Sequence, residues 1–126
     1  MNKPAFAAHA QQTPWGFAEI DPAAFASGRG QVRLVDVREI HEFNDALGHI
    51  AGAELVPLAS LPAAAQSWRR DEPIAVVCRS GGRSARGAGA LTQLGFTQVY
   101  NVGGGMLGWN AAGLPVERQG TSTAAV

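Results

Sequence analysis

The chain of 126 residues contains a single cysteine, no excess of either charge and no long apolar run. One cysteine excludes a disulfide within the chain, disulfide exchange with a resolving cysteine, and zinc or iron–sulfur sites that need several thiolates. Lysine and arginine together number 10, as do aspartate and glutamate, and this balance argues against proteins that bind nucleic acids or anionic membranes. No segment approaches the ~20 apolar residues of a membrane-spanning helix.

The composition is otherwise that of one globular domain. Hydrophobic residues make up 46% of the chain and charged residues 16%, a balance that permits a core. At this length folding buries roughly two-thirds of the surface of the unfolded chain. We expect a domain over residues 15–117, a flexible N-terminal arm over 1–14 and a flexible C-terminal tail over 118–126. The first residues lack the apolar stretch of ~7–15 residues that a signal peptide needs, so we expect a cytoplasmic protein.

Short apolar runs alternate with amphipathic stretches along the domain. A strand that is covered on both faces is apolar throughout, as residues 74–78 are, and the alternation predicts an α/β domain around a mostly parallel sheet. Helix signals are clear at Asp21, an N-cap followed by Pro22, and at Gly95, which is suited to end a helix. We predict strands over 17–20, 32–37, 53–57, 74–78 and 98–102, helices over 22–27, 40–47, 58–68 and 84–94, and a turn at 103–105.

The single cysteine lies where ligands collect in such a fold, beyond the carboxyl end of a strand. Cys78 ends the apolar run 74–78, and the segment Arg79-Ser80-Gly81-Gly82-Arg83-Ser84 leads into the clearest helix. A helix N-terminus, and a loop in which glycines turn N–H groups inwards, both favour a thiolate over a thiol. The arginines at positions 79, 83 and 86 favour it too, so we predict a reactive Cys78 whose pKa lies below the usual value.

Cys78 and its neighbours also have ordinary structural interpretations. A single cysteine at a strand end is often a small buried hydrophobe, and arginines in a loop are often only solvated. Neither interpretation explains why two glycines, three arginines and a helix start surround one sulfur. A phosphate-binding P-loop is the other use of a glycine-rich turn between a strand and a helix, but this turn lacks the lysine of that motif.

Four separated motifs resemble those of one known family, the rhodanese domains. The segments Asp36-Val37-Arg38-Glu39, Glu42-Phe43 and Gly48-His49-Ile50-Ala51-Gly52-Ala53 are similar to the D-V-R-E…E-F…G-H-I-P-G-A signature, with alanine in place of proline and an insertion-like stretch at 44–47. Residues 76–84 resemble the active-site loop of the family, and residues 85–96 the helix after it. The resemblance continues to about residue 116 through the glycines 103–105, Met106, Trp109 and the segment 113–116.

The resemblance implies a three-layer fold with a five-stranded, mostly parallel sheet between helices, and sulfur transfer through a persulfide on Cys78. A small anionic sulfur donor such as thiosulfate would load the cysteine, and a thiol, cyanide or a protein would accept the sulfur. Arg79 and Arg83 would neutralise an oxyanionic donor, and Ser80 and Ser84 would donate hydrogen bonds, with a helix N-cap as the structural alternative for Ser84. We expect neither a cofactor nor a metal ion.

Three further motif residues are predicted to support the site rather than to touch substrate. Asp36 and Arg38 leave the end of a buried strand, where a paired charge usually fixes a neighbouring loop. His49 is predicted to be a hydrogen-bonded turn residue and not a general base. Phe43 and Trp109 are assigned to the core or to the wall of the site.

Two other functions are weighed against sulfur transfer. A cysteine phosphatase or arsenate reductase also uses a thiolate, but its loop needs five residues between cysteine and arginine, whereas four separate Cys78 from Arg83. A rhodanese-fold module that binds a partner, or presents sulfur to it, is the other alternative, although such modules typically lose the cysteine that this chain keeps. A thiosulfate sulfurtransferase is therefore the preferred prediction.

Overall fold

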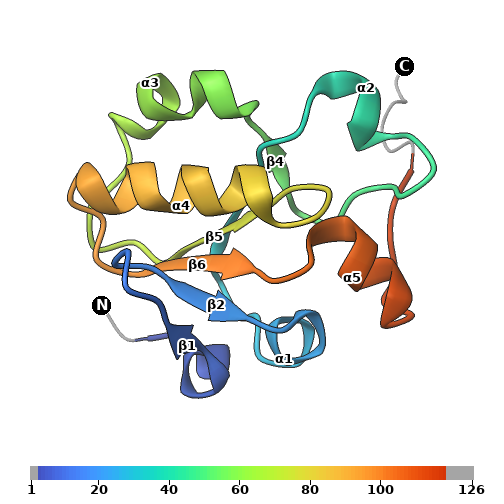
Figure 1. Ribbon diagram of the computed structural model, residues 1–126, viewed down its shortest axis with the longest axis horizontal. Coiled ribbons are helices and arrows are strands. Elements are labelled where there is room, and N and C mark those ends of the chain that lie inside the picture. Colours follow the sequence, from blue (N-terminus) through green and yellow to red (C-terminus); the bar gives the residue numbers. More distant parts are fainter. Residues whose placement is uncertain (1–2, 119–126) are drawn as a thin grey trace.

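The computed structural model describes residues 3–118 as a sheet between two layers of helices (Figure 1). The sheet has the strand order β1-β2-β6-β5-β3-β4, with β1 Gln11–Gln12, β2 Ala18–Ile20, β3 Arg33–Asp36, β4 Glu54–Leu55, β5 Ile74–Val77 and β6 Val99–Val102. Neighbouring strands are parallel except β1, which pairs antiparallel with β2. The mostly parallel α/β fold expected from the sequence is confirmed.

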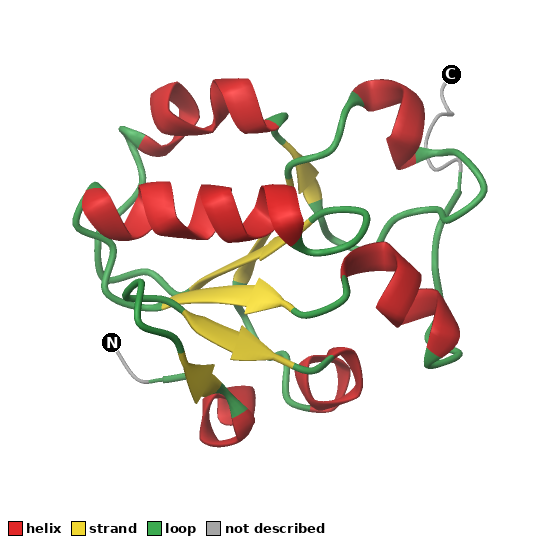
Figure 2. Ribbon diagram, viewed as in Figure 1, coloured by secondary structure: helices red, strands yellow, loops and turns green. Residues whose placement is uncertain are grey.

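Helices cover both faces of the sheet (Figure 2). On one face α3 and α4 bury Leu61 and Leu91, and on the other η1, α1 and α5 bury Phe6, Phe25 and Trp109. These residues lie in two separate apolar clusters because the sheet divides the core. The helices are the 3₁₀ turns η1 (Ala5–His9) and η2 (Leu58–Ser60), and α1 (Pro22–Ser27), α2 (Ile40–Phe43), α3 (Leu61–Ala65), α4 (Gly82–Gln93) and α5 (Gly105–Ala111).

The parallel strands bring three separate segments together at one edge of the sheet. Strand β5 lies between β3 and β6 and runs in the same direction as both. The chain leaves these strands after Asp36, Val77 and Val102, so the segments that follow lie side by side. Cys78 is therefore placed between the segment after β3 and the glycine run after β6.

The N-terminal segment is the largest difference from the sequence-based expectation. Residues 3–14 were expected to belong to a flexible arm, which is wrong: η1 buries Phe6 completely, and Gln11–Gln12 adds a sixth strand to the five predicted. The Phe6 ring makes edge-to-face contacts with Phe25 and Tyr100, with centroids 5.0 and 4.8 Å apart. The buried Phe6 ring anchors this segment to the core. The polar residues around it gave no hydrophobic pattern from which the burial could be predicted. Of the predicted tail over 118–126, residues 119–126 lie outside the described residues.

Helices also differ from the predicted boundaries, and the helix predicted over 58–68 consists of the 3₁₀ turn η2 followed by α3, which ends at Ala65. The helix predicted over 40–47 ends at Phe43, because a turn in which Gly48 has a φ of +62° follows it. The glycine run 103–105, predicted as a turn, starts the helix α5, whose Gly104 and Gly105 have φ values of +74° and +58°. No helix among residues 3–118 has the length and apolar character needed to cross a lipid bilayer.

Candidate active site at Cys78

Cys78 lies at the bottom of a loop that turns hydrogen-bond donors towards its sulfur. The residue is 1% exposed, and its Sγ accepts hydrogen bonds from the Gly81 N–H at 3.1 Å and from the Ser84 hydroxyl at 3.3 Å. Gly81 has a φ of +109°, a conformation that favours glycine, and this turn points its N–H at the sulfur. The loop thus stabilises negative charge on Cys78 with groups that carry no net charge themselves.

The hydrogen bonds outweigh burial in setting the acidity of this thiol. Burial alone raises the pKa of Cys78, because it disfavours the charged thiolate. The hydroxyl of Ser84 and the backbone N–H groups of Ser84, Gly81 and Ser80 lower the pKa, and the result lies below the ordinary value for a cysteine. A thiol with a lowered pKa can act as a nucleophile, and the same donors can stabilise an anionic group attached to the sulfur.

The predicted loop residues have different positions around the sulfur. Ser84 is fully buried, and its hydroxyl also donates to the Gly81 carbonyl at 3.2 Å. The N-cap alternative for Ser84 is wrong, because the helix begins at Gly82 with Gly81 as its N-cap. Ser80 is exposed and has a backbone contact with the sulfur, not the hydroxyl contact expected of it.

Helix α5 fixes the backbone of Cys78 from the opposite side. The N–H groups of Met106 and Leu107 donate to the carbonyls of Cys78 and Arg79, at 2.8 and 3.0 Å. A Cβ on Gly105 would lie 2.5 Å from the Cys78 carbonyl oxygen, so only glycine fits this approach. This support was not predicted from the sequence, although the glycine run followed by Met106 and Trp109 was the signal for it.

Arg83 does not match the expected role of an unpaired anion binder. Its guanidinium forms a two-pronged ion pair with Glu42 in α2, at 2.8 and 2.9 Å. The hydrogen bonds from Arg83 hold the pKa of Glu42 at about 2, so this carboxylate is charged at any neutral pH. Glu42 was part of a recognised motif, but no role was predicted for it, because its partner lies 41 positions away.

Arg79 is the loop arginine that faces the solvent next to the nucleophile. It is exposed, and it has no carboxylate partner within the part of the chain that the structure describes. A small cavity of about 140 Å³ beside the loop is lined by Arg79, Arg38, Glu42, Asp45, Ala46 and Leu47. Arg79 is thus available for an anionic ligand in a way that Arg83 is not.

The predicted supporting residues contact one another and the turn at Gly48, and Arg38 also lines the small cavity beside Arg79. Asp36 and Arg38 form a buried ion pair of 2.8 Å, and Arg38 also donates to the Gly48 carbonyl at 2.7 Å. The His49 ring stacks on Phe43 with centroids 3.8 Å apart, and its Nδ1 lies 3.0 Å from the Phe43 carbonyl oxygen. These contacts join the segment after β3 to the turn at Gly48, and the supporting role of the three residues stays a prediction.

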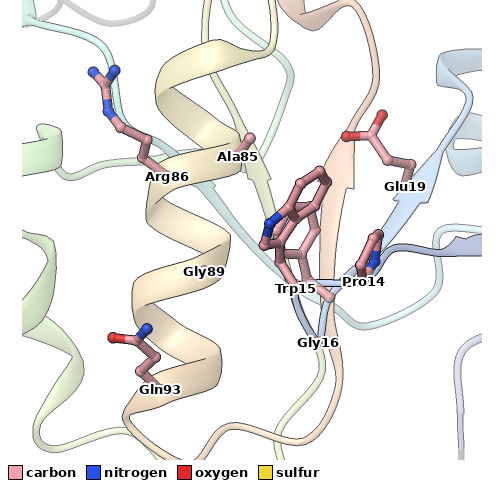
Figure 3. Close-up of a pocket in the computed structure, with 9 residues that line it drawn as sticks. Pro14, Trp15, Gly16, Glu19, Ala85, Arg86, Gly89 and Gln93 are labelled. Atoms are coloured by element: carbon pink, nitrogen blue, oxygen red, sulfur yellow. The ribbon is translucent and has the colours of Figure 1, made fainter.

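A second concavity lies away from the sulfur. A groove of about 690 Å³ runs between the turn at Trp15 and the helix α4, where Trp15 stands beside Ala85 and Gly89 (Figure 3). Cys78, Arg79 and Arg83 do not line it, so we assign no chemistry to it. Residues 3–118 contain no group of three histidine, cysteine, aspartate or glutamate side chains that could hold a metal ion.

Comparisons with known proteins give the family. The Rhodanese-like domain family model matches residues 22–112. A rhodanese-related protein from Thermoplasma volcanium has a similar structure, with a TM-score of 0.70 and 32% identity over 77% of this chain and 94% of that one. The chain belongs to the rhodanese-like domain family.

Two curated relatives show how far the similarity extends. The uncharacterized protein YqhL of Bacillus subtilis is 39% identical over 85 residues, which cover 68% of this chain and 66% of that protein. The thiosulfate sulfurtransferase GlpE of Vibrio cholerae is 31% identical over 99 residues, which cover 79% of this chain and 92% of that protein. The chain thus spans about two thirds of YqhL, and 55% of YrkF, another Bacillus subtilis relative.

Proposed function

We propose that the protein is a sulfurtransferase, which moves a sulfane sulfur from a donor such as thiosulfate to a thiol or cyanide through a persulfide on Cys78. The observation that carries this proposal is the arrangement of donors around the Cys78 sulfur, with the Gly81 N–H and the Ser84 hydroxyl both directed at it. A related protein of the same family named as a thiosulfate sulfurtransferase supports it. We further propose that this chemistry takes place in the cytoplasm.

The loading step uses the lowered pKa of Cys78. The thiolate attacks the outer sulfur of thiosulfate, a new sulfur–sulfur bond forms at Cys78, and the bond between the donor's two sulfurs breaks. Sulfite leaves with the bonding electron pair and two negative charges. The cysteine becomes an anionic persulfide, and the N–H and hydroxyl donors of the loop stabilise this charge.

The unloading step regenerates the thiolate. An acceptor thiolate or cyanide attacks the outer sulfur of the persulfide, and the bond to the Cys78 sulfur breaks with its electrons left on Cys78. The product is a persulfide of the acceptor or thiocyanate. Because Cys78 itself is 1% exposed, the added outer sulfur projects further towards an acceptor than the original thiolate does.

The loop geometry favours this chemistry over phosphoryl transfer. Four residues separate Cys78 from Arg83, and Arg83 is held by Glu42 in α2. A phosphatase loop needs an arginine that turns back onto the phosphoryl group, whereas the arrangement here serves a single sulfur.

The direct test is the intact mass of the protein after exposure to thiosulfate. We expect one added sulfur atom on the wild-type chain and none on Cys78→Ser, because a serine hydroxyl is almost the same size but forms no persulfide. Sulfur transfer to cyanide should be lost in the variant while its melting temperature stays close to that of the wild type. An added sulfur on the serine variant, or retained activity, would rule out the proposed mechanism.

A further inference from the structure

The two arginines of the Cys78 loop, Arg79 and Arg83, differ in their pairing with carboxylates. Arg83 is paired with both oxygens of Glu42, at 2.8 and 2.9 Å. Arg79 is exposed and has no such partner within residues 3–118. The charge that a donor meets at the mouth of the site therefore depends on one residue of α2, an element distant in sequence from the loop.

The Arg83–Glu42 pair lies within electrostatic reach of the reacting sulfur. The hydrogen bonds that Arg83 donates to Glu42 contribute most to raising the pKa of Arg83, and the negative charge of the Cys78 thiolate adds to this. Glu42 also lines the small cavity beside Arg79, together with Asp45. An anionic donor that approaches Cys78 thus meets the Glu42 carboxylate as well as the guanidinium groups.

We propose that Glu42 limits the charge selectivity of the donor site: by neutralising Arg83, it reduces the advantage of a doubly charged donor over a singly charged one to what Arg79 alone provides. This inference rests on the proposed function and names a specificity-determining residue for it. An unpaired guanidinium attracts a dianion about twice as strongly as a monoanion, whereas a neutralised pair distinguishes them weakly. A site of this kind discriminates less against monoanionic sulfur donors, such as thiol persulfides, than a site in which both Arg79 and Arg83 were unpaired.

Two donors isolate the effect of charge. Thiosulfate carries two negative charges, and methanethiosulfonate has a methyl group in place of one charged oxygen and carries a single charge. With both donors, the Cys78 thiolate forms a bond to the outer sulfur, and the leaving group is sulfite or methanesulfinate with the bonding electrons. Both reactions give the same persulfide, and the difference in leaving group is the same for every variant, so the change in the ratio of kcat/KM values between variants measures donor recognition.

Three variants of the pair give predictions of different sign. Glu42→Gln frees Arg83 but keeps an oxygen that can accept the Glu39 N–H, which Glu42 accepts at 2.9 Å. We expect this variant to raise the ratio of thiosulfate to methanethiosulfonate kcat/KM by about three- to tenfold at low salt, and less at high salt. Arg83→Gln should lower the ratio, and the double variant Glu42→Gln/Arg83→Gln should return it close to the wild-type value.

Asp71→Asn is the matched control. Asp71 is also a carboxylate paired with an arginine, Arg69, at 3.0 Å, but it precedes β5 and lies at the opposite edge of the sheet. This variant changes the net charge by the same amount and should leave the donor ratio unchanged. An equal response to Asp71→Asn would show that net charge, not the Glu42 carboxylate, sets the ratio, and would overturn the inference.

The outcomes separate this inference from the proposed function. If wild-type Cys78 forms no persulfide with either donor, the proposed function fails. If the persulfide forms but Glu42→Gln leaves the donor ratio unchanged, or lowers both rates equally, the pair has only a structural role and the inference fails. Should Glu42→Gln not fold, Arg83→Gln alone decides, since a ratio that does not fall contradicts the proposal.

Discussion

The two sides of the Cys78 site hold the sulfur environment by different means. On the side of α4 and α5, backbone N–H groups and glycines surround Cys78, as at Gly81 and Gly105. On the side of β3 and α2, charged side chains form ion pairs, one buried between Asp36 and Arg38 and one half-buried between Glu42 and Arg83. The N–H groups and the Ser84 hydroxyl stabilise an anion through their dipoles. The ion pairs hold the segments around the opening of the site and set the electrostatic potential there.

The comparison shows which changes each side tolerates. A backbone donor survives most substitutions of its side chain, so this side is sensitive mainly to residues that add bulk where two backbones touch. An ion pair depends on both partners, so removal of one leaves the other unbalanced. We therefore expect substitutions on the charged side to cause large losses, and substitutions on the backbone side to have effects that depend on crowding.

The largest expected effect is that of Asp36→Ala on stability. The change leaves the Arg38 guanidinium, which is 1% exposed, without its carboxylate, at a cost of roughly 3–5 kcal/mol. Thermal unfolding should show a melting temperature lower by about 10 °C or more, with turnover per folded molecule close to normal. A melting temperature that is unchanged while activity is lost would instead place Asp36 in the chemistry.

The next effect is that of Arg79→Ala on thiosulfate. This exposed arginine follows the nucleophile directly, so its loss should lower the kcat/KM for thiosulfate about tenfold to a hundredfold, or roughly 1.4–3 kcal/mol. The salt dependence should flatten, because a screened attraction has been removed. Equal slowing of thiosulfate and methanethiosulfonate, with unchanged salt dependence, would assign Arg79 to partner docking instead.

Gly105→Ala tests the backbone side. The new Cβ would lie 2.5 Å from the Cys78 carbonyl oxygen, so α5 or the loop must move, and sulfur transfer should fall. Gly30→Ala is a matched control, because Gly30 has a φ of +57° against +58° for Gly105 but no atom within 4 Å of an added Cβ. Chemical denaturation should show an extra loss of roughly 1–3 kcal/mol for Gly105→Ala. Equal losses would mean that φ alone explains the glycine.

The smallest effect concerns the pH dependence of Cys78. Loading requires the thiolate, so the rate rises with pH through the pKa of Cys78 and is constant above it. Ser84→Ala removes the hydroxyl that donates at 3.3 Å and should move this rise to higher pH. The pH profile of alkylation by iodoacetamide measures the shift. Ser80→Ala, which changes an exposed hydroxyl, should leave the profile in place, and a shift of the same size there would contradict the assignment.

Much of the fold could be predicted, because its signals are local. The five predicted strands and the helix over 84–94 follow from apolar runs, caps and glycine stops within a few residues of each element. The N-terminal segment and α5 escaped prediction for the opposite reason. Phe6 becomes an anchor only when Phe25 and Tyr100 surround it, and the need for glycine at position 105, where α5 begins, arises from the Cys78 backbone that lies against it.

The candidate site also has one part that local sequence signals predict and another part that depends on contacts between distant residues. The Cys78 loop could be predicted from the sequence, because Cys78, Gly81 and Ser84 lie within seven consecutive positions and their hydrogen bonds form within one loop. The pairing of Arg83 with Glu42, 41 positions away, could be seen only in the folded structure. A charge pair between separate elements depends on how those elements pack across the sheet, and residue spacing contains no measure of that distance.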